Sequence, residues 1–88
     1  MKITTNHPAS SYGVPVILDD DGTEMDYKEG VIALKAHLGL SLTTLAAAIG
    51  VSRATVADWT YGRNCPSARS LYALADLLAR HEEAKVPP

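Results

Sequence analysis

The side chains that could do chemistry are few in this chain, and most of them stand alone in the sequence. His7, His37 and His81 are scattered along it, with no second ligand at metal-binding spacing. Residues 19–22 form an acidic Asp-Asp-Asp-Gly run, but a calcium loop spreads its ligands over twelve positions and closes on a glutamate. We interpret this run as a solvated turn, and we expect no bound metal and no cofactor.

The residues needed for catalysis are equally sparse. Ser10, Ser11 and Ser41 have no base near them in the pattern, and the sequence shows no carboxylate pair and no glycine-rich phosphate loop. The single cysteine, Cys65, excludes an internal disulfide and a zinc site built from several cysteines. We interpret it as a spare thiol in a polar loop, and we do not expect an enzyme.

The remaining candidates are lysine and arginine side chains, which bind phosphate, and these are unevenly distributed. The 88 residues carry a net charge of −2. Two lysines against six carboxylates give residues 1–30 a net charge of −4, whereas five lysines and arginines against two aspartates give residues 31–80 a net charge of +3. Because salt screens charges beyond about 8–10 Å, the local excess decides the affinity for phosphate. We expect weak non-specific DNA binding that is strongly sensitive to salt.

The first 29 residues are predicted to form an extension of the main domain. Residues 1–12 are polar and show no periodicity, so we interpret them as a flexible arm. A β-branched apolar run from Val14 to Leu18, an Asp-Gly pair and the alternating residues 23–27 predict a β-hairpin. An isolated hairpin is barely stable in water, so it must pack on the helical body or on a second subunit.

From residue 28 the apolar residues recur with a helical period and predict four helices. The first ends at Gly39, the second spans 42–49 after a Ser41 cap, and the third spans 53 to about 60 after a Ser52 cap. The fourth, capped by Ser67, runs to about residue 83. No signal peptide and no membrane-length apolar run is seen, so we expect a cytoplasmic protein. The predicted core faces are Val31, Leu34 and Leu38; Leu42, Leu45, Ala46 and Ile49; Val56 and Trp59; and Leu71, Leu74, Ala75 and Leu78.

The second and third predicted helices form the most informative segment. Ala46 is small enough to let the two helices cross closely, and Gly50 lies where the turn needs a permissive backbone. Val51, Val56 and Trp59 are expected to fill the wedge between the helices. A helix pair with so short a turn, whose second helix shows polar groups to solvent, suits insertion into the major groove of DNA.

The segment from about residue 30 to 80 resembles the Cro/repressor (XRE-type) helix-turn-helix family of phage and bacterial transcriptional regulators. The resemblance implies a compact all-α, lambda-repressor-like domain that forms two-fold dimers on palindromic operators. Residues 1–29 have no counterpart in the family pattern. The positions that carry the resemblance are Leu40-Ser41, Leu45-Ala46, Ile49-Gly50-Val51-Ser52, Thr55-Val56, Trp59, Gly62, Pro66-Ser67, Leu71, Leu74-Ala75 and Leu78.

By this resemblance, residues 53–60 are the recognition helix. Arg53 is expected to pair with guanine O6 and N7, Ala54 and Ala57 to offer apolar contact to a thymine methyl, and Asp58 either to accept from cytosine N4 or to orient Arg53. Contacts to the DNA backbone are implied for Thr43, Thr44, Thr55, Tyr61, Arg63 and Asn64.

The sequence departs from the family pattern in three places. Leu42 stands where a glutamine that bonds the backbone and DNA is usual, so one positioning contact is expected to be lost. Thr60 replaces the usual glutamate, which removes its ion pair with a basic residue of the first helix, here Lys35. The fifth helix that is common in this family is not expected here, so dimerisation through the family's usual surface is not expected either.

These observations predict a four-helix all-α helix-turn-helix domain in residues 30–83, an N-terminal extension carrying a β-hairpin in residues 1–29 and a tail in residues 84–88. We expect a dimeric transcriptional repressor that binds double-stranded DNA sequence-specifically and acts on its own operon. The alternatives are an antitoxin whose N-terminal segment wraps a toxin while the body binds DNA, and a pure interaction module, such as an antirepressor, whose acidic face mimics DNA. We predict dimerisation through the hairpin, by Val14, Val16, Leu18 and Met25.

Overall fold

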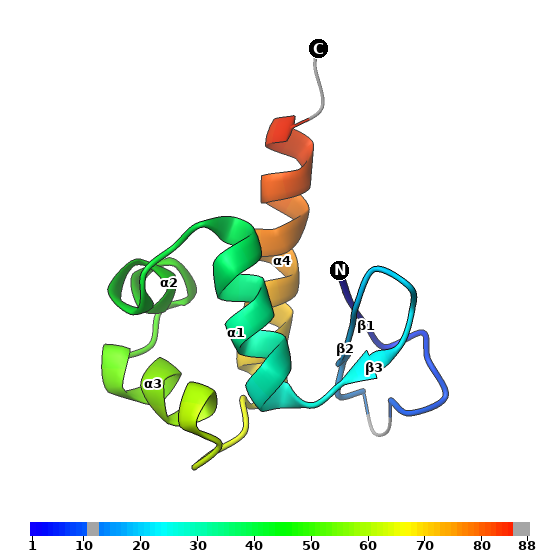
Figure 1. The fold of residues 1–88 in the computed structure, drawn as a ribbon, viewed down its shortest axis with the longest axis horizontal. Coiled ribbons are helices and arrows are strands. Elements are labelled where there is room, and N and C mark those ends of the chain that lie inside the picture. Colours follow the sequence, from blue (N-terminus) through cyan, green and yellow to red (C-terminus); the bar gives the residue numbers. More distant parts are fainter. Residues whose placement is uncertain (11–12, 86–88) are drawn as a thin grey trace.

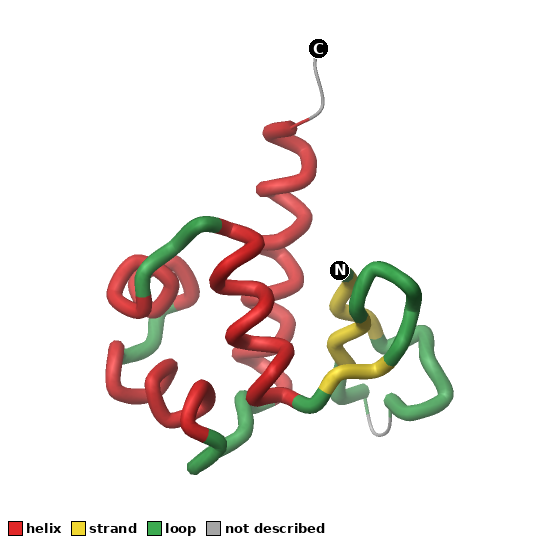
Figure 2. Tube along the Cα trace, in the orientation of Figure 1, coloured by secondary structure: helices red, strands yellow, loops and turns green. Residues whose placement is uncertain are grey.

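The computed structural model describes residues 1–10 and 13–85. It contains three short strands, β1 (Lys2–Thr4), β2 (Val16–Leu18) and β3 (Glu24–Met25). Four helices follow, α1 (Tyr27–Leu38), α2 (Leu42–Ile49), α3 (Arg53–Tyr61) and α4 (Ala68–Lys85). Helices and a small N-terminal sheet therefore confirm the predicted fold class, with the strands gathered at one side of the molecule (Figure 2).

The helices begin and end within two residues of the positions that the sequence indicates. Asp26 caps α1 by accepting a hydrogen bond from the Glu29 amide at 2.7 Å, so the helix starts one residue before its predicted position. Gly39 ends it with a positive φ of 68°, a conformation that glycine adopts without steric cost. Ser67 accepts from the Ser70 amide at 3.2 Å at the start of α4. This last helix continues to Lys85, two residues beyond its predicted end.

The prediction of a flexible arm is wrong for residues 2–4. They form β1, the outer strand of a three-stranded antiparallel sheet in the order β1-β2-β3, with Ile3 opposite Ile17. The strand forms because Ile3 packs at the margin of the core and because the N-terminal ammonium group donates to Asp20. That ammonium group lowers the pKa of the Asp20 carboxyl. Ser11 and Tyr12 of the predicted arm, and residues 86–88 of the predicted tail, lie outside the described residues.

The sheet packs on the chain's own helical body. Ile17 is completely buried against α1, where residue 30 is a glycine. Any side chain at Gly30 would collide with it, because a Cβ there would lie 2.6 Å from Ile17 Cδ1. The Tyr27 hydroxyl donates to the Pro15 carbonyl at 2.9 Å and fastens the start of α1 to the strand. The hairpin's need for a covering surface is thus met within one chain.

The helical core contains the predicted residues except Leu42, Ile49 and Ala75, which are only half-buried. Its buried members come from all four helices, and Trp59 is 3% exposed, as expected for a core residue. In Figure 1, α1 and α4 form the centre of the molecule, with α2 and α3 on one side and the sheet on the other. Among the described residues no single helix is long and apolar enough to cross a membrane; α1 and α2 meet those criteria only as a pair, which is bent by 98°. The buried apolar helix residues are Val31, Leu34, Leu38, Leu45, Ala46, Val56, Trp59, Leu71, Leu74 and Leu78.

Candidate nucleic-acid interface

The turn between α2 and α3 is built from local interactions. Ser41 caps α2 by accepting from the Thr44 amide at 3.1 Å, and Ser52 caps α3 by accepting from the Thr55 amide at the same distance. Gly50 ends α2 with φ of 78°, and the Val51 amide donates to the Ala46 carbonyl at 3.0 Å. The two helices are therefore joined by a tight turn held by local hydrogen bonds, as the sequence predicts.

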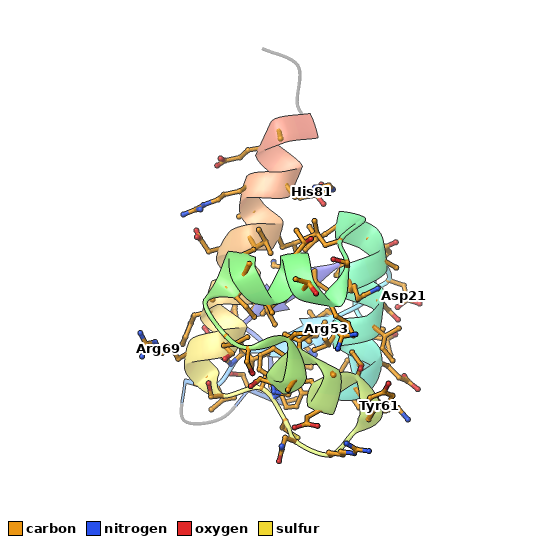
Figure 3. The ribbon with its side chains drawn as sticks, turned by 90° about the vertical axis from the view of Figure 1, so that its left-hand side faces the viewer. Asp21, Arg53, Tyr61, Arg69 and His81 are labelled. Atoms are coloured by element: carbon orange, nitrogen blue, oxygen red, sulfur yellow. The ribbon has the colours of Figure 1, made fainter. Side chains whose placement is uncertain are left out.

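One face of α3 is buried and the opposite face is open. Val56 and Trp59 point into the core. Arg53, Ala57 and Tyr61 follow each other at intervals of four residues, so they lie in one line along the outer side of the helix. Figure 3 shows Arg53 and Tyr61 on the side of the molecule formed by α2 and α3. Ala54 is exposed, and Asp58 is half-buried along the same face.

Asp58 connects this face to the loop that follows α3. Its carboxylate lies 3.6 Å from Arg63 Nη1 and 3.5 Å from Asn64 Nδ2, and these, not Arg53, are the partners that the structure records. The Arg63 guanidinium also lies 5.3 Å from the centre of the Tyr61 ring, within range of a cation–π contact. The loop itself is fixed to α3, because the Arg63 amide donates to the Asp58 carbonyl at 2.9 Å. The four side chains form one polar cluster at the end of the helix.

The threonines expected to bind the DNA backbone lie at helix N-termini. Thr43 and Thr44 are exposed in the first turn of α2, and Thr55 is half-buried in the first turn of α3. The hydroxyls of Thr44 and Thr55 lie 2.9 and 2.8 Å from the capping hydroxyls of Ser41 and Ser52. Free amides and the positive end of the helix dipole favour an anion at such positions.

Lys28 is a residue near the α3–α4 loop that no sequence motif marks as a DNA contact. Its aliphatic stem lies beside Gly62 of the α3–α4 loop, where a Cβ on the glycine would come within 3.4 Å of Lys28 Cδ. Lys28 belongs to α1, 34 positions before Gly62 in the sequence, so no local pattern links them. The structure thus places a further cation next to the loop that carries Arg63.

A family model described as helix-turn-helix matches residues 32–84, which is more than half of the chain. The chain belongs to the helix-turn-helix family of the Cro/repressor (XRE) type. This is a family of DNA-binding regulators. The curated proteins and the solved structures give no match to the chain.

The remaining arginines of this helix-turn-helix protein lie away from α3. Arg69 is exposed near the start of α4 and projects at the margin of the view in Figure 3, well apart from Arg53. Arg80 forms an ion pair with Asp76 one turn earlier on α4, at 2.9 Å. Cys65 is an exposed free thiol in the α3–α4 loop, as predicted.

Two histidines that the sequence analysis treated as isolated are neighbours in the fold. The rings of His37 and His81 lie 5.4 Å apart edge to face, and His37 Nε2 lies 2.7 Å from Glu82 Oε1. These contacts join the end of α1 to the far part of α4. Within the described residues, no group of three histidine, cysteine or acidic side chains has a geometry that could hold a metal ion.

The residues predicted to mediate dimerisation are largely used inside the chain. Val16 and Leu18 are buried within the chain, at 5% and 9% exposure. They flank Ile17 on β2, so their side chains point to the face of the sheet opposite the one that packs on α1. Val14 and Met25 are half-buried and pack at the margin of the same core. Dimerisation through these residues stays a prediction.

Proposed function

We propose that this helix-turn-helix protein is a sequence-specific transcriptional repressor that binds double-stranded DNA as a dimer. The observation that carries the proposal is the outer face of α3, where Arg53 and Ala54 are exposed and Ala57 is half-buried, on a helix fixed by its Ser52 cap. The two small alanine side chains allow the helix to come close to the floor of the major groove, and the long arginine side chain can reach the base edges.

In this proposal Arg53 reads guanine, because a guanidinium can donate two parallel hydrogen bonds to O6 and N7. Ala54 and Ala57 contact thymine methyl groups, and they leave room for the helix to enter. Backbone contacts come from the first turns of α2 and α3 and from the α3–α4 loop. The residues assigned to the backbone are Thr43, Thr44, Thr55, Tyr61, Arg63 and Asn64, to which we add Lys28.

The distribution of charge supports DNA binding by a chain with a net charge of −2. The acidic turn between β2 and β3 carries Asp19, Asp20 and Asp21, and it lies on the far side of α1 and α4 from α3 (Figure 1). Because exposed charges are screened over about 8–10 Å, these carboxylates do not cancel the attraction of Arg53 and Arg63 for phosphate. The acidic turn of residues 19–21 is thus electrostatically separate from the proposed DNA-binding face, whereas Glu24 and Asp26 of the extension lie nearer to the α3–α4 loop, in a hollow that Asn64 also lines.

Two copies are proposed to place their α3 helices in successive major grooves, about 34 Å apart, over an inverted repeat. Occupation of a promoter by such a dimer represses transcription by excluding the polymerase, and the protein's own operon in the bacterial or phage-infected cytoplasm is the proposed target. This assignment needs no cofactor.

The test compares two arginine variants on an operator selected from random duplex DNA. Arg53→Ala is expected to weaken operator binding by about 1–3 kcal/mol and to relax the choice of sequence. Arg80→Ala is the matched control, since it removes the same charge from an exposed position on α4 that pairs with Asp76. Equal losses in both variants would show that α3 does not read the DNA.

A further inference from the structure

We propose that Asp58 is an internal competitor for DNA phosphate, which occupies Arg63 and Asn64 in the free protein and thereby suppresses non-specific binding. This inference rests on the proposed function, because it concerns the same DNA-binding face. It gives Asp58 a part in specificity through its contacts within the protein.

The geometry places a carboxylate where a phosphate would otherwise bind. The Asp58 oxygens face Arg63 Nη1 at 3.6 Å and Asn64 Nδ2 at 3.5 Å, and both of these loop residues are exposed. A carboxylate and a phosphate present similar anionic oxygens to a guanidinium. Arg63 Nη1 cannot pair with the Asp58 carboxylate and with a DNA phosphate at the same time.

The strength of this contact suits competition. Arg63 is 72% exposed and Asp58 34% exposed, and an ion pair between such groups is worth little in water. Phosphate can therefore displace Asp58, but at a cost, and the carboxylate remains as a negative charge close to the DNA backbone. The contact reduces backbone affinity without blocking it.

The cost differs between operator and non-specific DNA. Asp58 lies on the outer face of α3, so in a correct site its carboxylate can accept from a cytosine N4 amino group. On other sequences the Asp58 carboxylate loses its contact with Arg63 and gains no hydrogen-bond donor from the DNA in return. The penalty therefore falls mainly on non-specific complexes, which is how a repulsive element produces specificity.

The test is Asp58→Asn in the full-length protein, with binding to an operator and to an unrelated duplex measured by fluorescence anisotropy over a range of salt concentrations. Asparagine has nearly the same shape and can still accept from Asn64, so the loop should keep its form. We expect the affinity for unrelated DNA to rise about three- to ten-fold. The affinity for the operator should rise less, and the salt dependence on unrelated DNA should steepen by about one released ion.

Two controls separate this effect from a general change of charge. Asp76→Asn removes the same charge and also frees an arginine, Arg80, but on α4; it should leave DNA affinity almost unchanged. In an Arg63→Ala background, Asp58→Asn should increase affinity less than it does in the wild-type background, because only the repulsion between the carboxylate and the DNA is then removed. An Asp58→Asn gain equal to that of Asp76→Asn, or a gain of undiminished size without Arg63, would overturn the inference while leaving the repressor function standing. Failure of wild type and variants alike to bind any DNA at low salt would overturn both.

Discussion

Replacing Gly30 with alanine should destabilise the protein, although the same change in an ordinary helix is stabilising. Gly30 lies inside α1 and is buried under the sheet. A Cβ at this position would stand 2.6 Å from Ile17 Cδ1 and 3.1 Å from both Cβ and Cγ2 of the same side chain. The Cδ1 methyl can rotate away, but Ile17 Cβ cannot, because β2 is hydrogen-bonded to strands on both sides.

The magnitude follows from two opposing effects. Alanine is favoured over glycine within a helix by about 1 kcal/mol, whereas overpacking a filled core costs about 1–3 kcal/mol. The clash should win, because it involves a fixed Cβ as well as a mobile methyl group. We expect a net loss of about 1 kcal/mol, which in a chain of this size lowers the melting temperature by about 4–8 °C.

Thermal unfolding followed by circular dichroism measures this change directly. Ile17→Val removes Cδ1, the atom of closest approach, so the double variant should be more stable than the sum of the two single losses predicts. A melting temperature of Gly30→Ala at or above that of wild type would refute the packing argument. It would mean that the sheet does not rest on α1 as described.

Two further predictions concern residues at the start of α1. Lys28→Ala should weaken binding to all DNA sequences alike and reduce the salt slope by about one, because the aliphatic stem of this cation lies beside Gly62 in the loop that carries Arg63. Salt-dependent anisotropy would show this, and a change of sequence preference would contradict it. Burial, with the nearby negative charges of the Cys65 thiolate and Glu24, raises the pKa of Tyr27 above its ordinary value of 10.0. The neutral phenol is therefore favoured in the folded state. The contribution of Tyr27 to the free energy of unfolding is present below its ordinary pKa and is lost as the pH rises through the raised pKa of the folded state. Denaturation at several alkaline pH values should show Tyr27→Phe to be less sensitive than wild type in this range; equal sensitivity would contradict the assignment.

The helix-turn-helix could be predicted because its signals are local. Ser41, Gly50 and Ser52 form caps and turns with residues three or four positions away, so their roles follow from spacing alone. The core positions of α1 and α4 follow from helical periodicity in the same way. The outer face of α3 was predictable for the same reason, since a helix with a known buried side also has a known exposed side.

The features that were missed depend on contacts distant in sequence. The strand at residues 2–4 is short and polar, and it becomes a strand only because β2 offers an edge more than ten residues later. Lys28 meets Gly62, and His37 meets His81, only after α1 has packed in the fold. Val16 and Leu18 are buried within one chain, but their apolar character did not indicate whether one chain or two would cover them.

The most direct test of the account is a mobility-shift titration of the wild-type protein against the DNA upstream of its own gene, at two salt concentrations. We predict a sequence-specific complex that weakens steeply with salt, with Arg53→Ala weaker by about 1–3 kcal/mol. Binding that is absent even at low salt would contradict the account, and it would assign the α2–α3 surface to a protein partner instead of DNA.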